Sequence, residues 1–157
     1  MNEKRREILK TGGGFTLLSL VAAAGWLQPG VAQAADWNKA AFETKTMDET
    51  MKALGGGVPA QSKDIAFVST PDIAENGAVV PVGVTSTIPK TESIAILIEK
   101  NPNLLAASFD IPAGTDPSIS TRVKMGQSSN VYALVKADGK YYVASKEIKV
   151  TLGGCGG

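Results

Sequence analysis

The sequence predicts a mainly β protein, an antiparallel β-sandwich with a helical segment before it and a short flexible arm after it. Three observations predict this architecture. From Lys63 onward, apolar residues recur with a period of two, which is typical of strands. Turn-forming pairs such as Asn76-Gly77 and Asp138-Gly139 interrupt the alternation at short intervals. The last five residues, 153–157, are four glycines around one cysteine, and they offer no apolar side chain to pack.

The composition excludes several classes of function. The 157 residues include no histidine and one cysteine, Cys155. The chain therefore lacks a Ser-His-Asp triad, a CxxC redox pair and a structural zinc site. Sixteen basic residues stand against 15 acidic ones, so the basic surplus of a nucleic-acid-binding protein is missing. We expect no catalytic residue, no metal ligand and no nucleic-acid partner.

Residues 1–34 have the features of an export signal. A basic region precedes an apolar run, 15–27, and Ala32 and Ala34 supply the small residues of a cleavage site. The run is shorter than the roughly 20 residues that span a membrane. We therefore expect no stable membrane anchor after cleavage.

The start of this segment also indicates the export route. Arg5, Arg6 and the four residues that follow resemble the twin-arginine motif, with Ile8 where phenylalanine is commonest. That route carries proteins that are already folded, often together with a partner. We expect a periplasmic protein that is exported by the twin-arginine pathway.

Residues 35–57 are expected to form an N-terminal helical segment, with one helix over 36–54. A capping box is predicted between the hydroxyl of Thr46 and the carboxylate of Glu49, three residues later. Apolar residues then follow at helical spacing. The glycines at 55–57 end the helix, because glycine adopts the left-handed conformation without penalty.

The sandwich domain is assigned to residues 58–152. Its seven strands are expected near 64–69, 78–86, 93–100, 104–111, 118–125, 129–137 and 140–152. The two-residue Asp138-Gly139 loop between alternating strands predicts a type I′ hairpin. Seven short strands in about 90 residues suggest an immunoglobulin-like sandwich, although the Cys-Trp-Cys signature is absent.

Two strands are apolar on both faces. In 93–100, three isoleucines face one way while Ala95 and Leu97 face the other way, and 129–137 repeats this pattern. A strand with water on one side should alternate apolar with polar residues. Both faces must therefore be covered, and either the N-terminal helix or a partner protein can supply the cover.

The arm carries the only reactive side chain that the sequence singles out. Cys155 stands between flexible glycines, which are Gly153, Gly154, Gly156 and Gly157. No Lys, Arg or His in the arm lowers the thiol pKa, so at an ordinary value of about 8.5 little thiolate exists at neutral pH. The chain does not activate its own nucleophile, and we interpret the arm as a swinging carrier that presents a bound group to other enzymes.

A second interpretation stays open. An odd cysteine in an exported protein often pairs with another chain. The protein would then be a periplasmic structural or adaptor β-sandwich whose Cys155 only forms an intersubunit disulfide.

The terminal Gly-Gly-Cys-Gly-Gly, the twin-arginine-like signal and the strand-rich domain together resemble the SoxY family, the sulfur carriers of periplasmic thiosulfate oxidation. The resemblance extends over the whole chain. It implies that Cys155 carries thiosulfate or sulfane sulfur as a covalent conjugate, with no other cofactor. It further implies that the chain is not an enzyme but a carrier on which partner enzymes act.

The resemblance also implies partners. SoxZ, a second β-sandwich protein without its own export signal, would form a heterodimer with this chain. The cytochrome complex SoxAX would attach the sulfur oxidatively, and the hydrolase SoxB would release sulfate. The sulfane dehydrogenase SoxCD could act between those steps.

Overall fold

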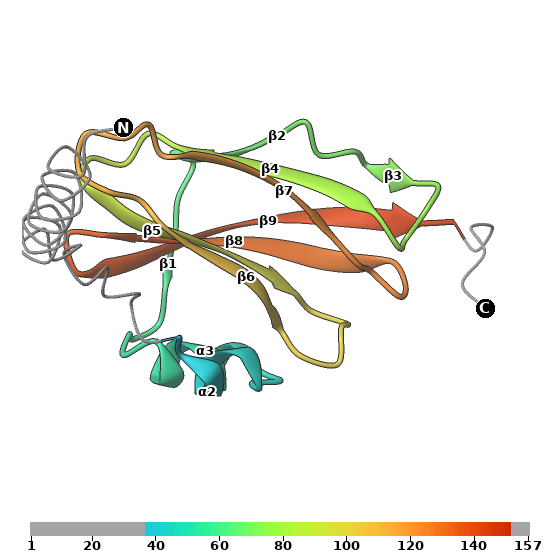
Figure 1. Ribbon diagram of the computed structural model, residues 1–157, viewed down its shortest axis with the longest axis horizontal. Helices are drawn as coiled ribbons and strands as arrows, with labels where there is room; N and C mark the ends of the chain where they lie inside the picture. The colour runs from blue at the N-terminus through green and yellow to red at the C-terminus, as the bar shows by residue number, and fades with distance from the viewer. Residues whose placement is uncertain (1–36, 152–157) are drawn as a thin grey trace, which may run out of the picture. The chain divides into compact units, whose positions relative to one another are not determined.

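A computed structural model of the chain describes residues 37–151, and two β-sheets form most of this part (Figure 1). The larger sheet has the strand order β1-β9-β8-β5-β6, with β3 beside β9, and the smaller has the order β2-β4-β7. The predicted mainly β sandwich is confirmed. The predicted signal segment, 1–34, and the arm, 153–157, lie outside the described residues. None of the helices in the described part is long and apolar enough to span a bilayer.

The strands are β1 (Ala60–Gln61), β2 (Ile65–Val68), β3 (Ile73–Ala74), β4 (Val80–Ser86), β5 (Thr91–Ile98), β6 (Leu105–Asp110), β7 (Ser118–Val123), β8 (Ser129–Ala137) and β9 (Lys140–Val150). The seven predicted strands correspond to β2 and β4 through β9. The prediction missed β1 and β3, which are two residues long and therefore too short to show alternation. Both pair parallel with β9, so the sandwich is not purely antiparallel.

The hairpin between β8 and β9 has the predicted turn. Ala137 pairs with Lys140 and leaves Asp138 and Gly139 as the loop. Both loop residues have positive φ, 49° and 72°, as a type I′ turn requires. The register of the two longest strands is therefore set by a turn that the sequence specifies.

The main core lies between the two sheets. Alternate residues of β5 and β8 face alternate residues of β4, and all of them are buried: Ile94, Ile96, Ile98, Val131, Ala133, Val135, Val80, Val82 and Val84. Met125 and Ile148 belong to the same core. The alternation that predicted the strands thus corresponds to one face packed on the opposite sheet.

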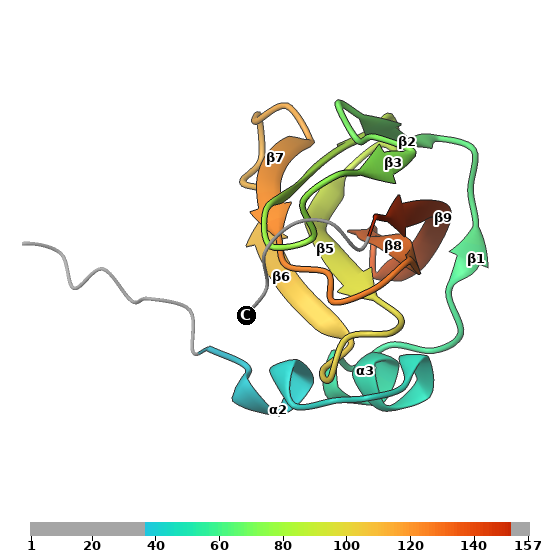
Figure 2. The same cartoon turned by 90° about the vertical axis from the view of Figure 1, so that its right-hand side faces the viewer.

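Two short helices, α2 (Lys39–Phe42) and α3 (Met47–Ala53), cover the second face of the larger sheet (Figure 2). Ala41 and Met51 pack there in a second cluster that also contains Ala95 and Leu97. The cover that these doubly apolar strands require comes from the chain itself. The strands therefore give no independent argument for a partner.

The prediction of a single helix over 36–54 is wrong, because a non-helical segment separates α2 from α3. Thr46 is extended, with φ −125° and ψ 156°, and it accepts a hydrogen bond from the Glu49 N–H while the Glu49 side chain accepts from the Thr46 N–H. The predicted capping box is confirmed, and it is the reason for the break, since it starts a new helix. Gly55, with φ 72°, follows the end of α3 as expected.

Candidate functional site

The structure describes the chain almost up to the beginning of the arm. Cys155 and the four arm glycines lie outside the described residues, and so do the predicted export residues Arg5, Arg6, Ala32 and Ala34. Thr151 is the last described residue and directly follows β9. The site that can be built from the described residues is therefore the root of the arm, the segment 148–151.

Strand β3 holds one side of the arm root. The Lys149 N–H donates to the Asp72 carbonyl at 2.9 Å, and the Thr151 N–H donates to the Ala74 carbonyl at 3.0 Å. These bonds continue the parallel register in which Ala74 pairs with Val150. The chain is thus fixed in an extended conformation up to Thr151.

The loop between β7 and β8 holds the other side. Strand β8 begins at Ser129, which pairs with Ile148, so Val150 lies beyond the end of its ladder. The Ser128 hydroxyl oxygen accepts a hydrogen bond from the Val150 N–H at 2.9 Å. The Ser128 side chain thereby supplies the acceptor that a further main-chain carbonyl of β8 would otherwise provide.

Gly77 packs closely against the arm root. The Met125 N–H donates to the Gly77 carbonyl at 2.7 Å and joins the β3–β4 loop to the β7–β8 loop. A Cβ at position 77 would lie 2.8 Å from Val150 Cγ1 and would also clash with the Met125 carbonyl oxygen. Glycine is needed here for close approach, because any side chain would displace Val150 or the neighbouring loop.

An ion pair ties the β2–β3 turn to β9. Lys146 Nζ lies 3.0 Å from a carboxylate oxygen of Asp72 and donates a hydrogen bond to the Thr70 carbonyl at 2.5 Å. The Lys146 side chain is 26% exposed whereas that of Asp72 is 87% exposed, so the carboxylate of this pair remains in contact with solvent. The turn that presents β3 to the arm root is thereby held against β9.

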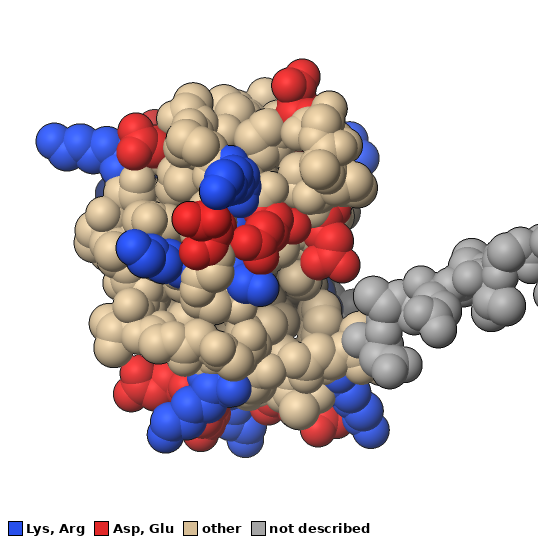
Figure 3. Space-filling model, turned by 90° about the vertical axis from the view of Figure 1, so that its left-hand side faces the viewer, with Lys and Arg blue, Asp and Glu red and all other residues tan. Residues whose placement is uncertain are grey.

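Most of the other close ion pairs lie at the opposite end of the sandwich. Lys136 Nζ is 3.0 Å from Glu92 and Lys90 Nζ is 3.1 Å from Asp138, around the β8–β9 hairpin. Figure 3 shows acidic and basic side chains side by side on this end. The hydrogen bond from Lys136 and a second one from the Gly139 N–H lower the pKa of Glu92, and the bond to Glu92 raises the pKa of Lys136. These charges tie together the β8–β9 hairpin and the ends of the strands beside it, remote from the arm root.

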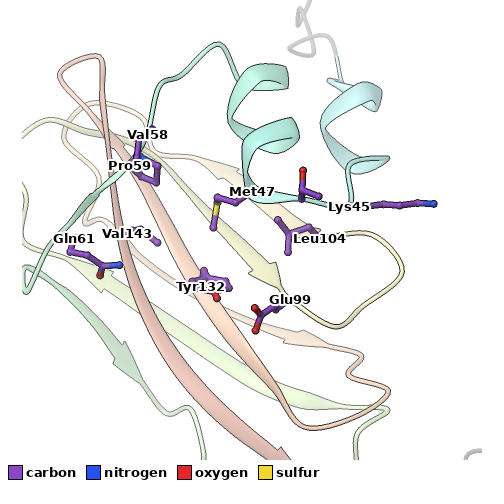
Figure 4. Close-up of a pocket in the computed structure, with 10 residues that line it drawn as sticks. Lys45, Met47, Val58, Pro59, Gln61, Glu99, Leu104, Tyr132 and Val143 are labelled. Carbon is purple, nitrogen blue, oxygen red and sulfur yellow. The ribbon is translucent and has the colours of Figure 1, made fainter.

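A cavity of about 490 Å³ lies beside α3 on the helix-covered face of the larger sheet (Figure 4). Its walls are largely apolar and include Met47, Leu104 and Tyr132. Burial, followed by the nearby charge of Glu99, raises the pKa of Tyr132. Sequence reasoning missed this cavity, since its lining comes from separate segments of the chain.

The described residues show neither a cluster of metal ligands nor a buried polar atom without a partner. They contain no group of three or more Asp, Glu, His or Cys side chains that could hold a metal ion. Their buried side-chain nitrogen and oxygen atoms all have hydrogen-bond partners. The sequence predicts its chemistry for the arm, and the arm root is the described segment that precedes the arm.

Comparisons with known proteins find one family and several solved structures that resemble this chain. The family described as "Sulfur oxidation protein SoxY" matches residues 50–155. The solved structure of the sulfur carrier protein SoxY from Chlorobium limicola f thiosulfatophilum matches with 39% identity and a TM-score of 0.60, over 67% of this chain and 96% of that one.

A second solved structure is more distant. A superoxide reductase (neelaredoxin) from Ignicoccus hospitalis is 18% identical with a TM-score of 0.48, over 55% of this chain and 80% of that one. A comparison with curated protein sequences finds no significant match.

Proposed function

The chain belongs to the SoxY family of sulfur oxidation proteins and has a carrier role in sulfur oxidation, and from that premise we propose that Cys155 is the residue that bears the sulfur. Sulfur intermediates of thiosulfate oxidation are held on its Sγ as covalent conjugates and are presented to partner enzymes. The chain itself performs no catalysis. It supplies a thiol, a tether and a fixed point of attachment.

One observation carries this proposal. The family match runs to residue 155, which is the only cysteine in the sequence, so the family resemblance includes the single thiol. The geometry of the arm root supports it. Hydrogen bonds to Asp72, Ala74 and Ser128 fix the chain up to Thr151, and the glycine-rich segment begins two residues later. A rigid anchor next to a glycine-rich tether suits a carrier that delivers cargo to several sites.

The chemistry requires partners at each step. Conjugation joins the Cys155 sulfur to the outer sulfur of thiosulfate, and it releases the thiol proton and an electron pair that SoxAX accepts. Hydrolysis by SoxB then adds water across the bond to the sulfonate, releases sulfate and a proton, and leaves a persulfide on Cys155. SoxCD is proposed to oxidise this remaining sulfane sulfur to a sulfonate on Cys155, with the oxygen atoms coming from water, the protons released to solvent and the electrons passing to acceptors of SoxCD.

The tether limits how partners approach. Cys155 is four residues beyond Thr151, and four fully extended residues span at most about 14 Å. An enzyme that works on the Cys155 sulfur must therefore bring its reacting groups within that distance of the arm root. Its contacts must include the sandwich end formed by β3 and the β7–β8 loop.

We also propose a cellular location and a stable partner for this chain. The twin-arginine-like signal with Arg5 and Arg6 supports export of the folded chain to the periplasm. Export in the folded state is compatible with joint transport of SoxZ as a heterodimer. These two elements rest on the sequence alone, because the residues concerned lie outside the described part.

Reconstitution tests the proposal. Purified SoxAX, SoxB and SoxZ with the full chain should give thiosulfate-dependent reduction of a cytochrome acceptor. Cys155→Ser should abolish this activity, whereas Ser120→Ala, on the outer face of β7, should leave it unchanged. If Cys155→Ser keeps full activity and only loses a disulfide-linked dimer, the structural or adaptor function is correct instead.

A further inference from the structure

Exposed apolar side chains gather near the arm root. In the described part of the chain, five large apolar side chains are well exposed, and three of them, Val68, Ile73 and Val79, fall within residues 68–79. Single exposed apolar residues are normal on a protein surface, whereas a cluster of them often marks an interaction site. This group lies on the segment that contains β3, which is beside the end of β9 (Figure 1).

Ile73 points outward from β3. The strand has two residues, and the second one, Ala74, is 5% exposed whereas Ile73 is 57% exposed. Successive side chains of a strand point to opposite faces, so the burial of Ala74 turns Ile73 toward solvent. Ile73 pairs with Lys149 in the parallel register of β3 and β9. Its side chain is therefore held in a fixed position beside the arm root.

Val79 lies at the same end of the sandwich, in the β3–β4 loop. It is 50% exposed and directly precedes Val80, which is buried in the main core. The Val79 N–H donates to the Asn76 carbonyl at 3.3 Å, and Gly77 between them packs closely against Val150. The same short loop therefore contacts the arm root and presents Val79 to solvent.

The fold does not require an apolar side chain at either position. Ile73 and Val79 belong to neither hydrophobic cluster. At the opposite end of the sandwich the exposed side chains around the β8–β9 hairpin are ion-paired instead. The apolar character of the two side chains is thus available for a contact outside the domain.

On the basis of the proposed function, we propose that Ile73 and Val79, with Val68 of β2 at their margin, form the docking surface for the enzymes that act on the Cys155 sulfur. The length of the arm indicates this occupant, because Cys155 can lie at most about 14 Å from Thr151. An enzyme that receives the thiol must approach this end of the sandwich. The matching surface of the enzyme carries apolar side chains at the entrance to its active site, with polar groups around them, as at other interfaces.

The double variant Ile73→Thr/Val79→Thr tests the surface. Threonine keeps the β-branched shape of both side chains and replaces one methyl or ethyl group by a hydroxyl. The variant chain, in complex with SoxZ, is the substrate of SoxAX with thiosulfate and, once conjugated, of SoxB. With both enzymes the KM for the chain should rise about tenfold, which corresponds to about 1.4 kcal/mol of lost binding free energy. The kcat should not change, because the arm and its thiol are intact.

Val58→Thr is the matched control. Val58 is 94% exposed and precedes β1, in which Ala60 pairs with Tyr142. Tyr142 is eight residues before Val150, so Val58 lies on the order of 26 Å or more from the arm root. The KM of this variant should equal that of the wild type with both enzymes.

Two further measurements separate docking from an effect on the fold or on the arm. The midpoint of thermal unfolding should be the same in the double variant and in the wild type. The rate at which Cys155 reacts with a small aromatic disulfide reagent should also be the same, since this reaction needs no docking. A lower midpoint or a slower thiol reaction in the double variant would overturn the proposal.

The kinetic result can contradict the proposal in three further ways. An unchanged KM in the double variant, or an equal rise in Val58→Thr, would overturn it. A rise with only one of the two enzymes would overturn the shared surface. Loss of the complex with SoxZ in size-exclusion chromatography would assign these side chains to that contact instead. A wild-type chain that SoxAX does not conjugate at all would contradict the proposed function itself, and this inference with it.

Discussion

Thr151 donates its backbone N–H to the carbonyl of Ala74 at 3.0 Å, so the last described residue of the chain is still tied to β3. Ala74 is buried and anchors β3 in the core. The tether to Cys155 therefore starts from a fixed position and direction. Changes at this anchor should alter the dynamics of the arm without touching the thiol.

Ser128→Ala should loosen the arm root. The substitution removes the oxygen that accepts from the Val150 N–H at 2.9 Å. A lost hydrogen bond of this kind costs on the order of 1 kcal/mol of unfolding free energy. Amide hydrogen exchange should speed up at Val150 more than at Val143 in the middle of β9. Unchanged exchange at Val150 would show that this bond does not hold the root.

Gly77→Ala should destabilise the same end of the sandwich more strongly. Its new Cβ would meet Val150 Cγ1 at 2.8 Å and would clash with the Met125 carbonyl. Overpacking of this kind costs typically about 1–3 kcal/mol. Thermal unfolding should show a lower midpoint than the wild type. The control Gly126→Ala, where a Cβ meets nothing within 4 Å, should unfold like the wild type.

The ionisation of Glu92 should make the stability of the sandwich end around the β8–β9 hairpin, opposite the arm root, sensitive to acid. The hydrogen bonds from Lys136 and the Gly139 N–H hold the pKa of Glu92 below its ordinary value. A carboxylate with a lowered pKa in the folded state adds stability above its unfolded pKa, and this contribution disappears as the pH falls through the folded pKa. Lys136→Met should raise the pKa of Glu92 toward its ordinary value in an NMR titration. A pKa that does not move would show that Lys136 is not the main cause.

Part of the fold could be predicted because it is specified locally. Strand β8 has the predicted bounds, 129–137, since alternation and the Asp138-Gly139 turn fix both its face and its end. The capping box between Thr46 and Glu49 could be predicted for the same reason, as both residues belong to one turn. In each case a few consecutive residues contain the whole signal.

Other features depend on distant parts of the chain and could not be predicted. The strands β1 and β3 exist only because β9 offers an edge to pair with, and two residues have no periodicity of their own. The role of Ser128 as an acceptor for Val150 depends on the register of β8 and β9. At the candidate site the sequence indicated Cys155 and its glycines, but nothing in it pointed to the anchor from which they extend.

The central claim is that Cys155 bears the sulfur, and the mass of the carboxyl-terminal peptide tests it most directly. The full chain is incubated with thiosulfate, SoxAX and an oxidised electron acceptor, and the peptide that contains Cys155 is then weighed. The account predicts a reducible increase equal to a thiosulfate conjugate, which is absent in Cys155→Ser. An unmodified Cys155 peptide, with SoxAX shown to be active on another member of the family, would contradict it.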